Sequence, residues 1–151
     1  MRVYRLCKRD YSATVLSGEG GLHADGRWQS AGRRIVYCGS SEALAILELR
    51  VRVGRFRPKA EYTMHVIEIP DRMALMAALD ELPADRDLVP HAAASQHFGS
   101  DWLAARRSVA LRVPSVHGRS DFNLLINPAH RSIASKGVLK SRAYSFDARL
   151  F

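Results

Sequence analysis

Short runs of apolar residues alternate with polar ones along much of the chain, which is the pattern of half-buried β-strands. The clearest run is RIVYC (34–38), whose β-branched and aromatic residues favour a strand. Successive side chains of a strand point to opposite faces, so Ile35 and Tyr37 are expected to share one face. The same reasoning predicts further strands at residues 3–6, 62–70, 109–114, 122–127 and 142–151.

Three segments have the composition and ends of helices. In GSSEALAILELRV (39–51), alanine and leucine fill the interior, and Ser40 or Ser41 can cap the first turn. DRMALMAALDEL (71–82) has an aspartate at its start followed by an apolar stripe. SDWLAARRS (100–108) has an acidic start and a basic end, which matches the helix dipole.

Two longer stretches between these elements are predicted to be irregular. Residues 17–32 are rich in glycine, and residues 82–96 contain prolines, with alanines that can form a turn of helix. Strands and helices are mixed without regular alternation, and no glycine-rich turn joins a strand to a helix in the manner of nucleotide-binding folds. This favours an α+β fold with mixed, mostly antiparallel strands and a few short helices over a doubly wound α/β fold.

The size and composition are those of an ordinary globular domain. With 151 residues, 47% of them hydrophobic, and with no internal repeat or linker, the chain is predicted to form a single compact domain over residues 1–151. The net charge of +8 comes almost entirely from arginine. Because guanidinium groups suit carboxylate and phosphate recognition, the charge favours an anionic partner: a nucleic acid, a phosphorylated small molecule or an acidic protein.

The sequence also predicts the compartment. The N-terminal MRVYRLCKRDYS has no long apolar segment, and no stretch approaches the roughly 20 apolar residues that span a bilayer, so we expect neither a signal peptide nor a membrane partner. Cys7 and Cys38 lack the spacing of a metal or redox motif. We therefore expect a cytoplasmic protein in which both reduced thiols are small core residues.

Glu48 is the most unusual residue of the predicted helix over 39–51. Its neighbours one turn away include Leu44, Ala45 and Val51, so a carboxylate lies on a largely apolar face. Such a carboxylate is either desolvated and functional, or pairs with Arg52 four residues later as a weak surface feature. Spacing alone leaves both interpretations open.

Other candidates lie where predicted strands and loops end. Tyr37 ends a strand, and Arg27 lies on the glycine-flanked loop; a strand tyrosine is usually core, and a loop arginine is usually solvated. Ser115 follows the strand that Pro114 ends, and its alternative role is a turn serine that binds local backbone. Asn127 and His130 mark a later turn, where His130 can also be a plain surface histidine.

Several well-known sites are unsupported by the sequence. The six histidines form no HxH or HExxH pattern, so no metal is expected, and no P-loop, GxGxxG or nucleophile elbow is present. The arginine-rich ELRVRVGRFRPK (48–59) could contact nucleic acid, but it is not accompanied by clustered aromatic residues.

Taken together, four motifs in order resemble the RES domain family, which is named for an arginine, a glutamate and a serine. The motifs are GRW (26–28), VYCGSSEALAILE (36–48), LRVPS (111–115) and NLLINPAH (123–130), and the resemblance covers roughly residues 4–150. It implies a fold similar to ADP-ribosyltransferase toxins, NAD as the substrate, and the role of toxin in a bacterial toxin–antitoxin pair. The implied partner is an antitoxin with a helix-turn-helix portion, through which DNA is contacted only indirectly.

The resemblance also implies the site residues. Arg27, Tyr37, Glu48 and Ser115 match the family's arginine, tyrosine, glutamate and serine, and Asn127 and His130 match its NP.H turn. Arg27 would pair with the pyrophosphate of NAD, Tyr37 would pack on nicotinamide or ribose, and Ser115 would hydrogen-bond ribose or amide. Glu48 would stabilise the positive charge that develops on ribose when nicotinamide leaves. The acceptor of the ribosyl group, whether water, phosphate or a protein, is left open.

Two interpretations from other functional classes compete with that of an NAD-consuming toxin. A basic nucleic-acid-binding module is favoured by the net charge and residues 48–59, and would show salt-sensitive binding without NAD turnover. A non-catalytic domain that docks an acidic partner would bind that partner and leave NAD intact.

Overall fold

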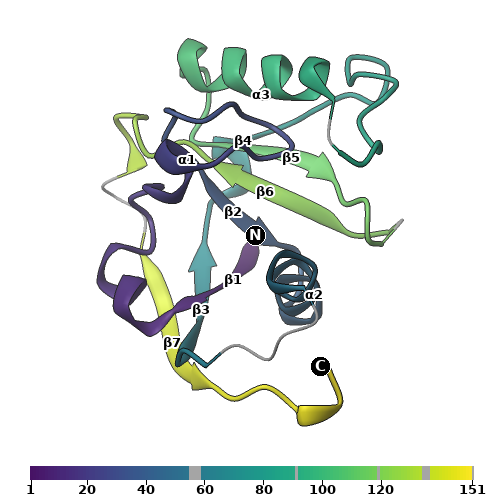
Figure 1. Cartoon of the computed structure of the whole chain (residues 1–151). Coiled ribbons are helices and arrows are strands. Elements are labelled where there is room, and N and C mark those ends of the chain that lie inside the picture. Colours follow the sequence, from purple (N-terminus) through teal and green to yellow (C-terminus); the bar gives the residue numbers. More distant parts are fainter. Residues whose placement is uncertain (55–58, 91, 119, 134–136, 151) are drawn as a thin grey trace.

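The computed structural model describes residues 1–54, 59–90, 92–118, 120–133 and 137–150. It contains one seven-stranded sheet with the strand order β4-β5-β6-β2-β1-β3-β7 (Figure 1). The strands are β1 Arg2–Lys8, β2 Val36–Gly39, β3 Tyr62–Glu68, β4 Ala74–Met76, β5 Ala110–Pro114, β6 Phe122–Ile126 and β7 Val138–Tyr144. The α-helices are α1 Gly20–His23, α2 Glu42–Val53 and α3 Ala93–Ala105, and short 3-10 helices are η1 Arg9–Thr14, η2 Asp71–Met73 and η4 Ala148–Leu150.

The strand pairing confirms the predicted α+β class. Neighbouring strands are antiparallel except for β4 and β5, which are parallel. Ile35 and Tyr37 pack into the same apolar cluster, while Val36 and Cys38 lie in the cluster on the other face, as the alternation predicts. Cys7 and Cys38 are both buried free thiols, which confirms their assignment to the core.

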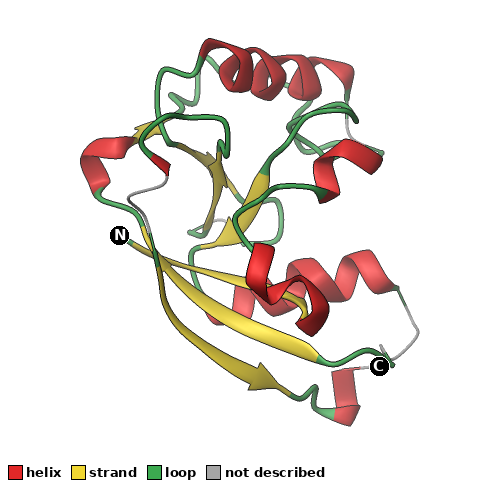
Figure 2. Cartoon of the chain, turned by 90° about the vertical axis from the view of Figure 1, so that its left-hand side faces the viewer, coloured by secondary structure: helices red, strands yellow, loops and turns green. Residues whose placement is uncertain are grey.

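The sheet is divided where β1 meets β2. β1 pairs with β3 from Arg2↔Glu68 to Lys8↔Tyr62, but it pairs with β2 only at Tyr4↔Gly39. The sheet therefore consists of two halves, β4-β5-β6-β2 and β1-β3-β7, whose strands run in different directions in Figure 1. Figure 2 shows α3 at the top of the molecule and the β1-β3-β7 half below it.

Each half is covered by its own helix. Trp102 and Leu103 of α3 pack with Leu111 and Leu125 of β5 and β6. Ala45 of α2 packs on side chains of β1 and β3. α2 therefore lies next to the place where β1 and β2 separate, which we call the opening between β1 and β2.

The sequence of α2 sets its ends much as predicted. Ser41 caps the helix, since its Oγ accepts a hydrogen bond from the backbone N–H of Leu44 at 3.1 Å. The helix ends at Gly54, whose φ of 69° is in the left-handed region that favours glycine. Leu44 and Ala45 are buried, and Leu47 and Val51 are exposed, so Glu48 lies at the border between the two faces.

The predicted helix over 71–82 is wrong. The segment forms η2 and then β4, which pairs in parallel with β5. Most of its expected apolar stripe does not face the core: Leu75, Met76 and Leu79 are exposed, and Leu82 is the member that is buried. Pairing with β5 satisfies the backbone groups that a helix would have satisfied internally, so tertiary contacts override helix propensity here.

Two other boundaries differ from the prediction. The helix expected from Ser100 begins at Ala93, because the alanines of the supposedly irregular segment are strong helix formers that continue into it. The last strand covers Val138–Tyr144, and η4 follows it, so only the start of the strand-like segment 142–151 is extended. In the described part of the chain, no helix is long and apolar enough to cross a membrane.

Candidate active site

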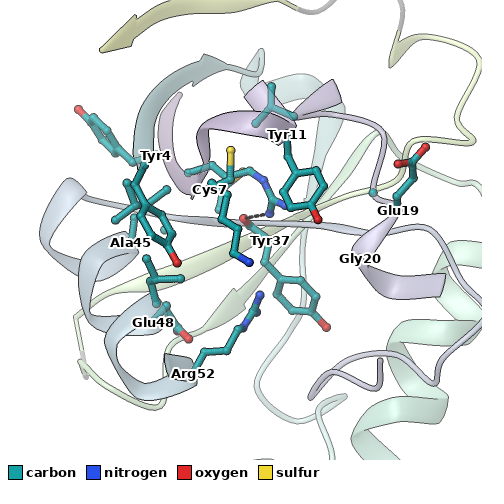
Figure 3. A pocket seen from close by; sticks show the side chains of 18 of the residues that line it. Tyr4, Cys7, Tyr11, Glu19, Gly20, Tyr37, Ala45, Glu48 and Arg52 are labelled. Carbon is teal, nitrogen blue, oxygen red and sulfur yellow. Dashed lines mark hydrogen bonds between the residues drawn. The ribbon is translucent and has the colours of Figure 1, made fainter. Parts of the chain in front are cut away.

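A cavity of about 440 Å³ lies at the opening between β1 and β2. Its walls come from β1, η1, α1, β2 and α2, so residues far apart in the sequence face one space (Figure 3). The cavity exists because β1 pairs with β2 at a single residue pair, and none of the described strands fills the gap between them.

Glu48 lines this cavity from α2. Its carboxylate accepts a hydrogen bond at Oε1 from Asn123 Nδ2 at 2.8 Å, and Oε2 lies 3.7 Å from His117 Nε2. The alternative ion pair with Arg52 is not formed among the described residues, although Arg52 lines the same cavity one turn later. The side chain of Glu48 is 36% exposed, so its carboxylate is held on one side and accessible on the other.

Tyr37 brings an aromatic ring to the cavity and a hydroxyl to the glycine-rich loop. Its hydroxyl donates to Gln29 Oε1 and accepts from the backbone N–H of Trp28 at 3.2 Å. Burial raises the pKa of Tyr37 above the usual range of a phenol, so the hydroxyl stays protonated and keeps its donor role. A Cβ on Gly26 would lie 2.5 Å from this hydroxyl, so glycine is needed there for close packing.

Arg27 lies beside this network, but its guanidinium is directed elsewhere. Its Nη1 donates to the carbonyl oxygens of Arg86 and of Leu88, the latter at 2.9 Å, and its side chain is not part of the cavity wall. The next residue, Trp28, is 2% exposed and meets Phe98 edge to face, so it anchors the loop to the core. In the described structure, Arg27 is therefore linked to Tyr37 through the backbone N–H of its neighbour Trp28, and its own side chain takes no part in that link.

Ser115 is buried at the start of the turn between β5 and β6. Its Oγ accepts from the backbone N–H of His117 at 3.1 Å, and its own N–H donates to the carbonyl of Asp121 at 3.1 Å. The side chain therefore makes the local backbone contact expected of a turn serine. It is brought near Glu48 through His117 and does not itself line the cavity.

Asn127 and His130 lie beyond the opposite end of β6 from Asn123. Asn127 is 1% exposed, and its Nδ2 donates to the carbonyl of Leu103 at 2.8 Å, which ties the strand to α3. His130 Nδ1 accepts from the backbone N–H of Ser132 at 3.1 Å. The structure does not bring either side chain to the cavity of Glu48.

Arg5 is a site residue that the sequence reasoning missed. Its Nη1 donates to the carbonyl of Tyr37 at 2.9 Å, drawn as the dashed line in Figure 3, and its buried Nε has no hydrogen-bond partner among the described residues. Burial lowers the pKa of Arg5, and the groups that modify this effect are the thiols Cys7 and Cys38 and a second cation, Arg52. An anionic ligand would offset this charge.

The alternation of side chains along the first predicted strand could have indicated Arg5. It has the same parity as Val3 and Cys7, which are both buried, so an arginine occurs on the inward face of the first predicted strand. Asn123 begins the NLLINPAH motif, but nothing local in the motif indicates its contact with Glu48, which depends on the pairing of distant strands.

The cavity wall therefore combines two carboxylates, three cationic side chains and four tyrosine rings: Glu19 and Glu48, Arg5, Lys8 and Arg52, and Tyr4, Tyr11, Tyr37 and Tyr62. This set suits a ligand that carries both an anionic part and a part where positive charge is present or develops. Among the described residues, no three His, Cys, Asp or Glu side chains are grouped as metal ligands.

Comparisons with known proteins give one consistent match. The family model of the RES domain matches residues 2–147. The chain is 38% identical over 145 residues to the "Prs ADP-ribosylating toxin" of Sphingobium sp., covering 94% of this chain and 90% of the relative. It is 31% identical over 151 residues to "Toxin Res" of Yersinia enterocolitica, covering 99% of each. In fold it is similar to a chain of the M. tuberculosis MbcT–MbcA toxin–antitoxin complex, with a TM-score of 0.78, 18% identity, and coverage of 95% of this chain and 84% of that one.

Proposed function

Because the chain belongs to the RES domain family, we propose that it is the toxin of a bacterial toxin–antitoxin pair and that it consumes NAD by cleaving the bond between nicotinamide and ribose. The names of its relatives support this proposal, since one is called an ADP-ribosylating toxin and others are called toxins. The single observation that carries it is the position of Glu48, whose carboxylate faces the cavity while Asn123 holds one of its oxygens.

A lone carboxylate is sufficient for this chemistry. The nicotinamide ring of NAD is a cation, and when its bond to ribose breaks, the bonding electrons leave with the ring, which becomes neutral and needs no general acid. Positive charge then develops on the ribose, as in glycoside cleavage. The carboxylate of Glu48 would stabilise this charge, and an acceptor oxygen or other nucleophile would add to the ribosyl carbon and lose its proton to solvent.

The cavity supplies cations for the pyrophosphate. Arg5 and Arg52 line it, and a guanidinium group is suited to pair with phosphate oxygens. Arg27, which the resemblance assigns to the pyrophosphate, would first have to exchange the carbonyls of Arg86 and Leu88 for phosphate oxygens. We therefore propose Arg5 as a binding residue in addition to Arg27.

The remaining roles follow from position. The ring of Tyr37 would pack on nicotinamide or ribose, because its hydroxyl network fixes the ring at the cavity wall. Ser115 would act on the ribose or on the orientation of Glu48 from the β5–β6 turn. The acceptor can be water, phosphate or a protein side chain, and each gives a different product.

The proposed partner is an antitoxin with a helix-turn-helix portion. The similar fold of a chain from the MbcT–MbcA toxin–antitoxin complex supports an antitoxin as the partner. We propose that an antitoxin segment enters or covers the cavity near Glu48 and Arg27. NAD should then bind free protein but not the complex, as calorimetric titration of both would show; equal binding by the two would contradict blocking of the cavity.

Mass spectrometry of the products of NAD tests the activity. The free protein is incubated with NAD, with and without inorganic phosphate, and ADP-ribose, a phosphorylated ADP-ribose or modified protein identifies the acceptor. Glu48→Gln is expected to lower nicotinamide release by roughly 100-fold or more, because the carboxylate charge acts in the transition state. Glu42→Gln is the matched control, since Glu42 lies on the same helix and pairs with Arg142 at the surface. Equal turnover by Glu48→Gln and the unmodified protein would overturn the mechanism.

Arg27→Ala is a second test of the binding site. It is expected to abolish NAD consumption while the circular dichroism spectrum stays unchanged. If turnover persists and Arg5→Met abolishes it, the pyrophosphate is bound by Arg5 rather than by Arg27.

A further inference from the structure

The carboxylate of Glu48 contacts two side chains that come from outside its own helix. Asn123 on β6 donates to Oε1 at 2.8 Å, and His117 in the β5–β6 turn has its Nε2 3.7 Å from Oε2. Neither residue is the arginine, the glutamate or the serine after which the RES family is named. Asn123 lies on β6, which β2 separates from β1 in the sheet, and its side chain also lines the cavity.

The sheet fixes the position of Asn123. Its partner in β2 is Gly39, and its partner in β5 is Val113, so its backbone lies between two strands. A Cβ on Gly39 would lie 3.0 Å from the backbone nitrogen of Ala45, which shows how closely α2 approaches the sheet here. This close approach brings Asn123 within hydrogen-bond distance of Glu48.

The turn that carries His117 is also fastened in place. Asp121 accepts a hydrogen bond from the Ser40 hydroxyl at 2.9 Å, just before the start of α2, and its N–H donates to the carbonyl of Gly118 at 3.0 Å. The N–H of His117 donates to Ser115 Oγ at 3.1 Å. The turn and the helix of Glu48 are therefore parts of one hydrogen-bonded unit.

We propose that Asn123, with a smaller contribution from His117, is a positioning residue that sets the orientation of the Glu48 carboxylate. This inference rests on the proposed function, in which that carboxylate faces developing positive charge. A glutamate side chain has several rotamers, and fixing one of them in advance lowers the entropy lost in the transition state. An amide is suited to this task because it donates a hydrogen bond and leaves the carboxylate charge available. His117 contributes less because 3.7 Å exceeds hydrogen-bond distance.

The test is steady-state NAD consumption by variants of the whole chain. Asn123→Ala is expected to lower kcat by roughly 10- to 100-fold, the size of one hydrogen bond to a charged group, with KM changed less than about twofold. Asn123→Asp, which has the same shape but repels Glu48, is expected to lower kcat further. His117→Ala is expected to lower kcat by about two- to fivefold, and His117→Gln, which keeps a donor, is expected to recover part of this loss.

Controls and coupling separate positioning from folding. Ser120→Ala in the same turn and His97→Gln on α3 are exposed and should leave kcat unchanged. In a Glu48→Gln background, Asn123→Ala should cause little further loss, because the group that it positions has already been changed. Additive losses, an unchanged kcat in Asn123→Ala, or a raised KM with unchanged kcat would each overturn the inference.

A spectroscopic measurement distinguishes failure of this inference from failure of the proposed function. If the unmodified protein releases no nicotinamide, the proposed function is wrong. The side-chain amide resonance of Asn123 in a 15N-labelled sample then reports the contact by itself: it should move in Glu48→Gln and stay in place in Glu42→Gln. An amide resonance that is insensitive to Glu48 would show that Asn123 does not hold the carboxylate.

Discussion

The two edges of β1 differ sharply in how far they pair with a neighbouring strand. On one edge, β3 pairs with β1 from Arg2 to Lys8; on the other, β2 pairs with it only at Tyr4. The paired edge is surrounded by fully buried apolar residues such as Val3 and Ile67. The open edge borders the cavity that contains Glu48 and Arg5.

This difference shows how a small sheet leaves a cavity beside one of its strands. An open strand edge leaves backbone groups without strand partners, and here the carbonyl of Tyr37 accepts from Arg5 instead. Arg5 also lines the cavity, and its buried Nε has no hydrogen-bond partner among the described residues. One edge of β1 is therefore closed by strand pairing, and the other leaves the groups that the proposed function uses for binding.

Removing apolar volume on the paired edge should produce the largest change in stability. Ile67→Ala is expected to lower the free energy of unfolding by about 2–5 kcal/mol, because Ile67 is 0% exposed and its removal leaves a cavity in the core. Urea denaturation followed by circular dichroism measures this. The half-buried neighbour Val66→Ala should lose less, and equal losses at both positions would contradict the role of the paired edge.

On the open edge, Arg5→Met should affect NAD far more than stability. We expect NAD consumption to fall by roughly 10- to 100-fold, because a hydrogen bond from a charged donor to phosphate is lost. Unfolding free energy should change by only about 1 kcal/mol or less, because losing the bond to Tyr37 and relieving a buried charge oppose each other. Kinetics and urea denaturation are compared with Arg2→Met, which is exposed on the same strand. A large loss of stability with normal turnover would reverse our assignment of this edge.

Asn127→Ala extends the comparison to the far end of β6. It is expected to lower the free energy of unfolding by about 1–3 kcal/mol, because the buried carbonyl of Leu103 loses its donor. The expected pattern is the opposite of Asn123→Ala, which should lower kcat with a smaller effect on stability. Thermal unfolding and NAD consumption of the two variants decide this, and reduced turnover at full stability would place Asn127 in the site.

The smallest expected difference is in the reactivity of the two buried thiols, Cys7 on β1 and Cys38 on β2. Burial raises the pKa of Cys38 to about 12, so its thiolate fraction at about pH 8 is roughly one in ten thousand. Burial also raises the pKa of Cys7, and nearby Arg5 partly opposes this rise. Native protein should therefore react slowly with iodoacetamide, Cys7 faster than Cys38, and both rapidly after unfolding. Peptide mass spectrometry over time measures the order, and faster labelling of Cys38 would mean that β2 separates from its neighbours.

The sequence was sufficient to predict the parts of the molecule whose local signals agree with the fold. The strand around Tyr37 alternates, and α2 has a serine cap and an alanine- and leucine-rich interior, so both formed close to their predicted bounds. Residues 71–82 failed because their apolar stripe resembles a helix, whereas pairing with β5 decides their structure. Local periodicity cannot anticipate a strand partner more than 30 residues away.

The candidate site likewise has residues that the sequence indicated and contacts that it did not. Glu48 was recognisable as a carboxylate on an apolar helix face, and the structure brings it to the cavity with Tyr37. Its contacts with Asn123 and His117 depend on how β6 and its turn meet α2, which no local pattern encodes. The roles of Arg27, Ser115, Asn127 and His130 remain predictions from the family resemblance, and the variants above test them.

The strand order also constrains how this protein can be assembled or divided. The chain alternates between the two halves of the sheet: β1, β3 and β7 lie in one half, and β2, β4, β5 and β6 lie in the other. Neither half is a continuous stretch of polypeptide. During synthesis, the residues that contact Glu48 from β6 emerge after most of the chain, so no early fragment contains a complete cavity with its carboxylate held in place.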